Sequence, residues 1–144
     1  MPRSVDGLDG LVGTWDVRRL VLDSLAGTRG EFVGTATFAA DDGGVVQTEA
    51  GELTYGDHRG PAERHLLWGP GSADGVQVRF ADGRPFYVYR PVAGEWTAVH
   101  PCGADEYVVT GRWLGPHAFD EEWSVTGPTK SYRLLSSYRR HPSP

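Results

Sequence analysis

The sequence predicts an all-β protein, built as a single closed or nearly closed antiparallel up-and-down β-barrel of about ten strands. Three observations support this fold class. Glycine, proline and aspartate punctuate the chain every 8 to 12 residues or so, and helical spacing of apolar residues is scarce between these turns. Gly13-Thr14-Trp15 and Tyr138-Arg139 bracket the strand-like stretches. A closed barrel hides its strand edges and leaves an interior that is either packed or able to hold one small ligand.

Each expected strand is a run rich in β-branched or aromatic residues that ends at a turn signal. The runs are 14–22, 31–39, 45–55, 62–68, 76–80, 86–90, 96–100, 107–114, 119–126 and 130–138. Ala81-Asp82-Gly83-Arg84 is the clearest hairpin turn, because Asp-Gly favours positive φ angles. Leu8 to Leu11 is expected to form a short turn that closes the barrel floor. The expected organisation is an N-terminal segment 1–12, a barrel domain 13–140 and a flexible tail 141–144.

Composition narrows the functional classes. The 144 residues fit one domain, and a net charge of -5 argues against a nucleic-acid partner, which usually meets a basic face. No stretch approaches the roughly 20 apolar residues of a membrane span, and the N-terminus lacks an apolar run, so we expect no membrane partner. Cys102 is the only cysteine, which favours a cytoplasmic location over an oxidising compartment. The sequence leaves a homodimer open.

Strand alternation predicts which side chains point into the barrel. The expected interior has an aromatic wall of Phe32, Phe38, Trp68, Trp96, Trp113 and Trp123. It also has a polar set of Arg19, Glu49, Arg64, His100, Tyr107, Glu121 and Tyr132. An ionised group without a partner in a dry core is costly, so these residues must pair, meet water or meet a ligand. One interpretation is therefore a set of internal salt bridges without a ligand, and the other is a binding site.

Several short motifs carry a resemblance to known barrels. They are Gly13-x-Trp15-x-x-x-Arg19, Glu49-x-Gly51, Asp82-Gly83-Arg84-x-Phe86, His100-x-Cys102-x-x-Asp105-x-Tyr107, Gly127-Pro128-x-Lys130-x-Tyr132 and the terminal Tyr138-Arg139 or Tyr138-x-Arg140. With these motifs the chain resembles the lipocalin and wider calycin barrels and, more narrowly, an uncharacterised family of short bacterial lipocalin-like proteins. The resemblance implies that Trp15 covers the barrel floor and that an arginine of the last strand, expected to be Arg139, lies over its ring. It implies a ligand cavity and no reaction.

His100-x-Cys102-x-x-Asp105 combines chemically active side chains at short spacing. The set is incomplete for a zinc site, which needs three or four ligands, so no metal is expected. His100 could act as an acid or base, with the Tyr107 hydroxyl beside it and Asp105 orienting it. The alternative is a plain turn that Asp105 caps. No Gly-x-Ser-x-Gly motif supports a hydrolase.

The favoured function is a small-molecule-binding barrel for a partly aromatic ligand with an acidic or polar end. Arg19, Arg64 and Lys130 would receive the anionic part, while Trp68 and Trp123 of the aromatic wall would supply apolar contact. Orientation would come from Glu49, His100, Tyr107 and Tyr132. The alternatives are a non-hydrolytic enzyme (an isomerase, cyclase or lyase) using His100, Glu49 and Tyr107 as catalytic candidates, and a haem-binding, nitrobindin-like barrel. The sequence requires no cofactor and does not decide between carrier and enzyme.

Overall fold

The computed structural model describes residues 8–71 and 75–142. The rest of the chain, which includes most of the expected N-terminal segment and residues 143 and 144 of the expected tail, lies outside the described residues. Ten strands make up the fold: β1 (Gly13–Asp23), β2 (Thr28–Asp41), β3 (Gly44–Tyr55), β4 (His58–Pro70), β5 (Val76–Phe80), β6 (Pro85–Tyr89), β7 (Glu95–Cys102), β8 (Asp105–Gly115), β9 (Ala118–Gly127) and β10 (Lys130–Arg140). No helix in the described ranges is long and apolar enough to cross a membrane.

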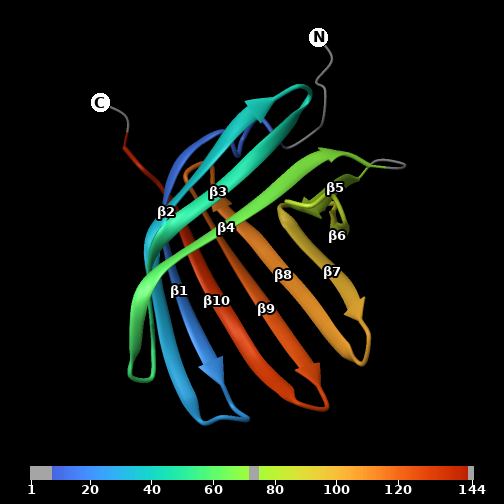
Figure 1. Ribbon diagram of the computed structural model, residues 1–144. Coiled ribbons are helices and arrows are strands. Elements are labelled where there is room, and N and C mark those ends of the chain that lie inside the picture. The colour runs from blue at the N-terminus through green and yellow to red at the C-terminus, as the bar shows by residue number, and fades with distance from the viewer. Residues whose placement is uncertain (1–7, 72–74, 143–144) are drawn as a thin grey trace.

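The strands form one antiparallel sheet that curls into a nearly closed barrel, which confirms the predicted fold class (Figure 1). Their order is β6-β5-β4-β3-β2-β1-β10-β9-β8-β7, so β1 and β10 pair and β6 and β7 are the two edges. We call the junction between these edges the seam. Rings close the seam in place of a hydrogen-bonded ladder: Tyr89 lies 5.0 Å from Trp96 and Phe86 lies 5.3 Å from His100, measured between ring centroids.

The alternation of side chains follows the sequence pattern on most strands. On β3, Val45, Gln47 and Glu49 are buried, while Ala50 between the inward positions is exposed. On β9 only Glu121 of the acidic run 120–122 points inward, as predicted. The predicted 81–84 turn joins β5 and β6, with Gly83 at a φ of 92°. Because side chains alternate in direction along each strand, polar residues at inward positions are thus placed inside the barrel.

One end of the barrel, which we call the floor, is sealed by the turn that Leu8 and Leu11 form. Trp15 is completely buried there and donates its indole N–H to the Leu11 carbonyl at 2.8 Å. The arginine above its ring is Arg140, whose guanidinium carbon lies 4.2 Å from the ring centroid, so the expectation of Arg139 was wrong. Tyr138 points inward, and alternation therefore turns Arg139 to solvent and Arg140 back over Trp15. Arg140 also donates to the carbonyls of three residues, Gly10, Val12 and Pro116.

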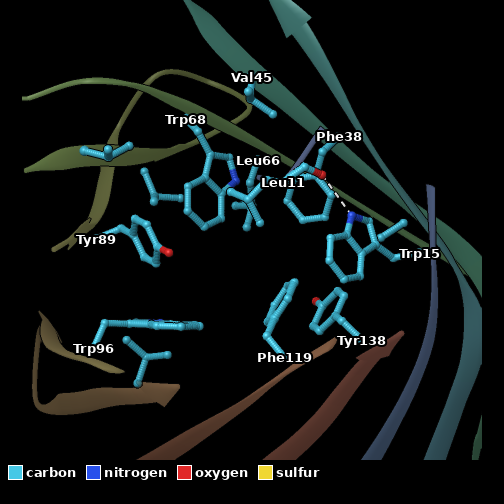
Figure 2. Close-up of a cluster of buried hydrophobic side chains, with 14 of the residues drawn as sticks. Leu11, Trp15, Phe38, Val45, Leu66, Trp68, Tyr89, Trp96, Phe119 and Tyr138 are labelled. Carbon is cyan, nitrogen blue, oxygen red and sulfur yellow. Dashed lines mark hydrogen bonds between the residues drawn. The ribbon is translucent and has the colours of Figure 1, made fainter. Parts of the chain in front are cut away.

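The other end, which we call the mouth, carries the four hairpins β1–β2, β3–β4, β7–β8 and β9–β10 (Figure 1). Inward-facing side chains become more exposed toward it. On β1, Trp15 and Val17 are fully buried and Val21 is half-buried; on β10, Tyr138 is buried and Tyr132 half-buried. Figure 2 shows the packed cluster of aromatic and aliphatic side chains at the floor side. The barrel is therefore solid near the floor and accessible near the mouth.

Candidate functional site

The carboxylate of Glu49 is the centre of a buried polar network halfway along the barrel. Its side chain is 1% exposed and accepts hydrogen bonds from Arg19 at 3.0 Å and from Arg64 at 3.2 Å. Gln47 donates to the same carboxylate at 2.7 Å, and the Tyr138 hydroxyl donates to it as well. Residues from β1, β3, β4 and β10 thus converge on one anion. The lysine-poor composition suits this arrangement, because guanidinium groups bind carboxylates through several donors.

The network keeps Glu49 ionised. Burial by itself would raise the pKa of Glu49, but the charges of Arg64 and Arg19 outweigh it and, with the hydrogen bonds, lower the pKa to about 2. Four donors occupy the two carboxylate oxygens. A carboxylate in this state is a poor proton acceptor, and its position is that of an anion shared by two arginines.

The two arginines share this one carboxylate. Arg19 is 10% exposed and is further satisfied by the Ser136 hydroxyl at 2.7 Å and the Tyr138 hydroxyl at 2.9 Å. Arg64 keeps 28% of its side chain exposed, although it bonds to Glu49 and Tyr138 inside the barrel, and its buried Nε has no hydrogen-bond partner among the described residues. Arg64 therefore has unused hydrogen-bonding capacity and contact with solvent.

Glu121 is the second carboxyl in the interior, and it does not complete a second salt bridge with Arg64 or Arg19 among the described ion pairs. The residue as a whole is 8% exposed. Burial raises the pKa of Glu121, and the attraction of Arg64 and Arg19 offsets this only in part. Glu121 and Arg64 both line a small internal cavity of about 10 Å³, room for about one water molecule. Of these two interior carboxyl groups, only Glu49 thus forms salt bridges with the arginines in the described part of the chain, so the interpretation of internal salt bridges holds for Glu49 and not for Glu121.

An aromatic stack forms the wall beside this cavity. The ring of Phe86 lies parallel to Trp123, with centroids 4.7 Å apart and planes 4° apart. Phe80 stacks on the other side of Phe86 at 4.4 Å, and His100 contacts both phenylalanines edge-on at the seam. This stack, Phe80–Phe86–Trp123, gives the interior a flat apolar surface next to Arg64 and Glu121.

A second polar group lies at the mouth. Lys130, 40% exposed, contacts the Asp105 carboxylate at 3.1 Å and donates to the Tyr107 hydroxyl at 3.3 Å. The hydrogen bonds to Asp105 and Tyr107 raise the pKa of Lys130. Burial, together with the neighbouring Tyr107, raises the pKa of Tyr132 to about 12, so its hydroxyl is a donor at neutral pH. Asp105 binds Lys130, and the contacts of His100 are the rings of Phe80, Phe86 and Tyr107.

A larger hollow of about 600 Å³ lies on the outer face of β7 to β10. Its exposed lining residues, such as Thr97 and Arg112, alternate along their strands with the inward-facing core. Two of its acidic residues take part in ion pairs, Asp120 with Arg139 at 3.1 Å and Glu122 with Arg133 at 2.9 Å. Because these paired side chains are partly exposed on the outer surface, the hollow makes a weaker case for a ligand site than the interior. In the described ranges no three His, Cys, Asp or Glu side chains are grouped to hold a metal ion.

All nine residues expected to bind ligand face the interior or the mouth, in two groups. Arg19, Glu49, Arg64, Trp68 and Trp123 surround the central network and cavity, and Lys130, Tyr107, Tyr132 and His100 lie toward the mouth and the seam. Tyr138 and Gln47 were not predicted from the sequence as partners of Glu49, and Phe86 was not predicted to lie in the stack. Strand alternation places Gln47 on the same face as Glu49 and turns Tyr138 inward on the last strand, so it could have indicated both. No alternation pattern indicated the inward direction of Phe86.

Comparison with known proteins agrees with the barrel fold. The S-type phycobiliprotein lyase CPES from Guillardia theta is similar in structure, with a TM-score of 0.66 and 12% sequence identity over 95% of this chain and 92% of that one. A protein of unknown function from the DUF3598 family, from Nostoc punctiforme, is also similar, with a TM-score of 0.62 and 10% identity over 98% of this chain and 52% of that one. At these identities the likeness is one of fold.

A search of curated protein sequences found no match. The model of one sequence family matches residues 11–140, which include every strand and both polar groups of the interior. The chain therefore belongs to DUF6314, a family of unknown function.

Proposed function

We propose that the barrel binds a small molecule that has a flat aromatic body and an acidic group. The acidic group pairs with Arg64. The observation that carries this proposal is that two interior guanidinium groups share one fully engaged carboxylate, while Arg64 still has solvent contact and an unpartnered Nε. An arginine in this state is suited to a second anion, because its planar fork offers several donors.

Apolar contact for the rest of the molecule comes from the aromatic wall. Phe86 and Trp123 lie beside Arg64 around the central cavity, so a ring attached to the acid would meet aromatic faces. Sites for small organic molecules commonly combine such apolar walls with a few polar groups that fix orientation. At the mouth, Lys130 and Tyr107 are placed to bind a second polar substituent.

The spacing of the two polar groups sets a rough length for the ligand. Arg19 pairs with Ser136 across the β1–β10 ladder, and Asp23 pairs with Tyr132 four residues farther toward the mouth. Four residues of a β-strand span about 13 Å. A ligand that engages both polar groups therefore has the size of two or three fused or linked rings.

The network favours binding over acid–base catalysis through Glu49. With a pKa of about 2 and four donors on its oxygens, Glu49 holds no proton to give and has little capacity to accept one. We therefore favour a carrier or sensor of an aromatic acid over an isomerase, cyclase or lyase that relies on this residue.

The test compares 2-naphthoate with the neutral analogue 2-naphthylmethanol by titration calorimetry. We expect the wild-type protein to bind the acid about tenfold or more tightly than the alcohol, since a hydrogen bond to a charged group contributes about 1.5–3 kcal/mol. Arg64→Met should remove this preference. The control is Arg59→Met on the same strand, because Arg59 is 71% exposed and pairs with Glu52 outside the barrel. Equal binding of acid and alcohol, or an unchanged preference in Arg64→Met, would refute the proposal.

A further inference from the structure

Phe86 is the middle ring of the aromatic stack beside the central cavity and is partly exposed to solvent. Its ring is sandwiched between Trp123 at 4.7 Å and Phe80 at 4.4 Å, and it is half-buried. A nearly parallel pair at this separation has the geometry that a flat aromatic ligand would adopt on the indole. The slot that Phe86 fills is thus shaped for a ring.

The backbone aims Phe86 into this slot by breaking the alternation of β6. Phe86 and Tyr87 are adjacent in sequence, and yet both rings contact Trp123, at 4.7 and 5.3 Å. The β5–β6 ladder shifts its register between Val78 and Arg79, opposite this point. A β-bulge re-aims side chains locally and is frequent beside functional sites.

Phe86 lies on β6, in a part of the sheet where the strands are short and pair over few residues. β5 and β6 have five residues each, and β5 pairs with β4 only over Leu66–Pro70. At the seam, β6 meets β7 through the Phe86–His100 and Tyr89–Trp96 ring contacts. Short elements held by few hydrogen bonds open locally at low free-energy cost.

Behind Phe86 lies the polar end of the candidate site. The lining of the small cavity includes Phe86 and Trp123 together with Arg64 and Glu121. With about 10 Å³ it is too small for an organic ligand as long as Phe86 occupies the slot. Displacement of the ring would join the cavity to the space that the ring leaves.

We propose that Phe86 is a displaceable plug, and that the flat aromatic part of the ligand takes its place against Trp123 while the acid reaches Arg64. This inference rests on the proposed function, and it adds the position of the ring and the route of access through the seam. The ligand class it names is a planar aromatic carboxylate at least as large as a phenyl ring. Binding then requires the hairpin to leave its closed position first.

The experiment measures 2-naphthoate binding to Phe86→Ala by calorimetry and by stopped-flow tryptophan fluorescence. If the open state makes up about 10% or less of the wild type, removal of the plug should tighten binding about tenfold or more. The observed association rate should level off with rising 2-naphthoate in the wild type and rise linearly in Phe86→Ala. Phe86→Leu keeps apolar bulk but cannot stack, and it provides a second variant if the alanine variant folds poorly.

Leu53→Ala is the control, because it enlarges the half-buried interior outside the stack and should leave affinity and kinetics close to those of the wild type. If the wild type binds 2-naphthoate through Arg64, but Phe86→Ala and Phe86→Leu bind with unchanged or weaker affinity and the wild-type rate rises linearly, the plug is refuted and the anion site stands. If neither the wild type nor the Phe86 variants bind 2-naphthoate, both the plug and the proposed function are refuted.

Discussion

Replacing Glu49 with glutamine should destabilise the barrel more than any exposed carboxylate replacement. The change keeps the size of the side chain and removes its charge. Arg19, 10% exposed, would then face the neutral end of a glutamine in a buried setting, and Arg64 would lose the same partner. Removing one partner of a buried ion pair leaves an uncompensated charge, which costs about 3–5 kcal/mol.

The lowered pKa of Glu49 gives a second value for this free-energy cost, and it is similar in size. The pKa falls from an ordinary 4.5 to about 2, and a tenfold change in the acid dissociation constant corresponds to about 1.4 kcal/mol of differential stabilisation. The ionised form is thus stabilised in the folded state by about 3 kcal/mol. In a domain of this size, such a loss should lower the melting temperature by about 10 °C.

Urea unfolding followed by tryptophan fluorescence measures the difference in the free energy of unfolding between wild type and Glu49→Gln. Glu31→Gln is the matched control, because Glu31 bonds to Arg18 at 2.8 Å on the outer surface, where the two side chains are 44% and 70% exposed. It should cost less than about 1 kcal/mol. A loss below about 1 kcal/mol for Glu49→Gln as well would refute the reasoning.

The same network predicts how the cost of Glu49→Gln depends on pH. The folded-state pKa of Glu49 lies below its unfolded value, so its stabilising contribution is fully present above about pH 4.5 and is lost as pH falls toward about 2. The difference between wild type and Glu49→Gln should therefore be largest near neutral pH and shrink across this window. A difference that stays constant down to pH 2 would show that charge is not its source.

Three further predictions concern the floor and the network. Arg140→Lys should lower the free energy of unfolding by about 1–2 kcal/mol, because lysine cannot cover the Trp15 ring and bond several carbonyls at once, whereas Arg139→Lys should cost less than about 0.5 kcal/mol in the same urea titration. Tyr138→Phe should cost about 2 kcal/mol by thermal melting, since the hydroxyl bonds to three charged groups. Glu121→Gln should stabilise the protein at pH 8 and not at pH 4, because a carboxyl whose folded-state pKa is raised loses stability as pH rises; an equal effect at both pH values would contradict this.

The sequence predicted the architecture well because strand alternation is a strong constraint. Once Trp15 is assigned to the interior, Val17 and Arg19 follow it, and the structure shows all three buried. The wrong expectation that Arg139 lies over Trp15 is explained by the same alternation. Tyr138 points inward, so the next residue, Arg139, points outward, and Arg140 takes the position over the Trp15 ring.

The candidate site was harder to predict, because its geometry depends on distant strands. Arg19 and Tyr138 are 119 positions apart and meet only through the β1–β10 ladder. One of the two interpretations of the 100–105 segment had Asp105 orienting His100, but Asp105 contacts Lys130, which begins β10. The inward direction of Phe86 depends on a register shift in β5–β6, and no residue pattern announces that shift.

The central claim, that the interior binds an aromatic acid on Arg64, is tested most directly by native mass spectrometry. Protein purified without denaturation would be offered a mixture of planar aromatic acids and their neutral alcohols. We predict that the wild type and Arg59→Met each retain one acid per chain, which is released on denaturation, and that Arg64→Met retains none. Wild-type protein without any bound acid, or an identical bound mass in Arg64→Met, would contradict the claim.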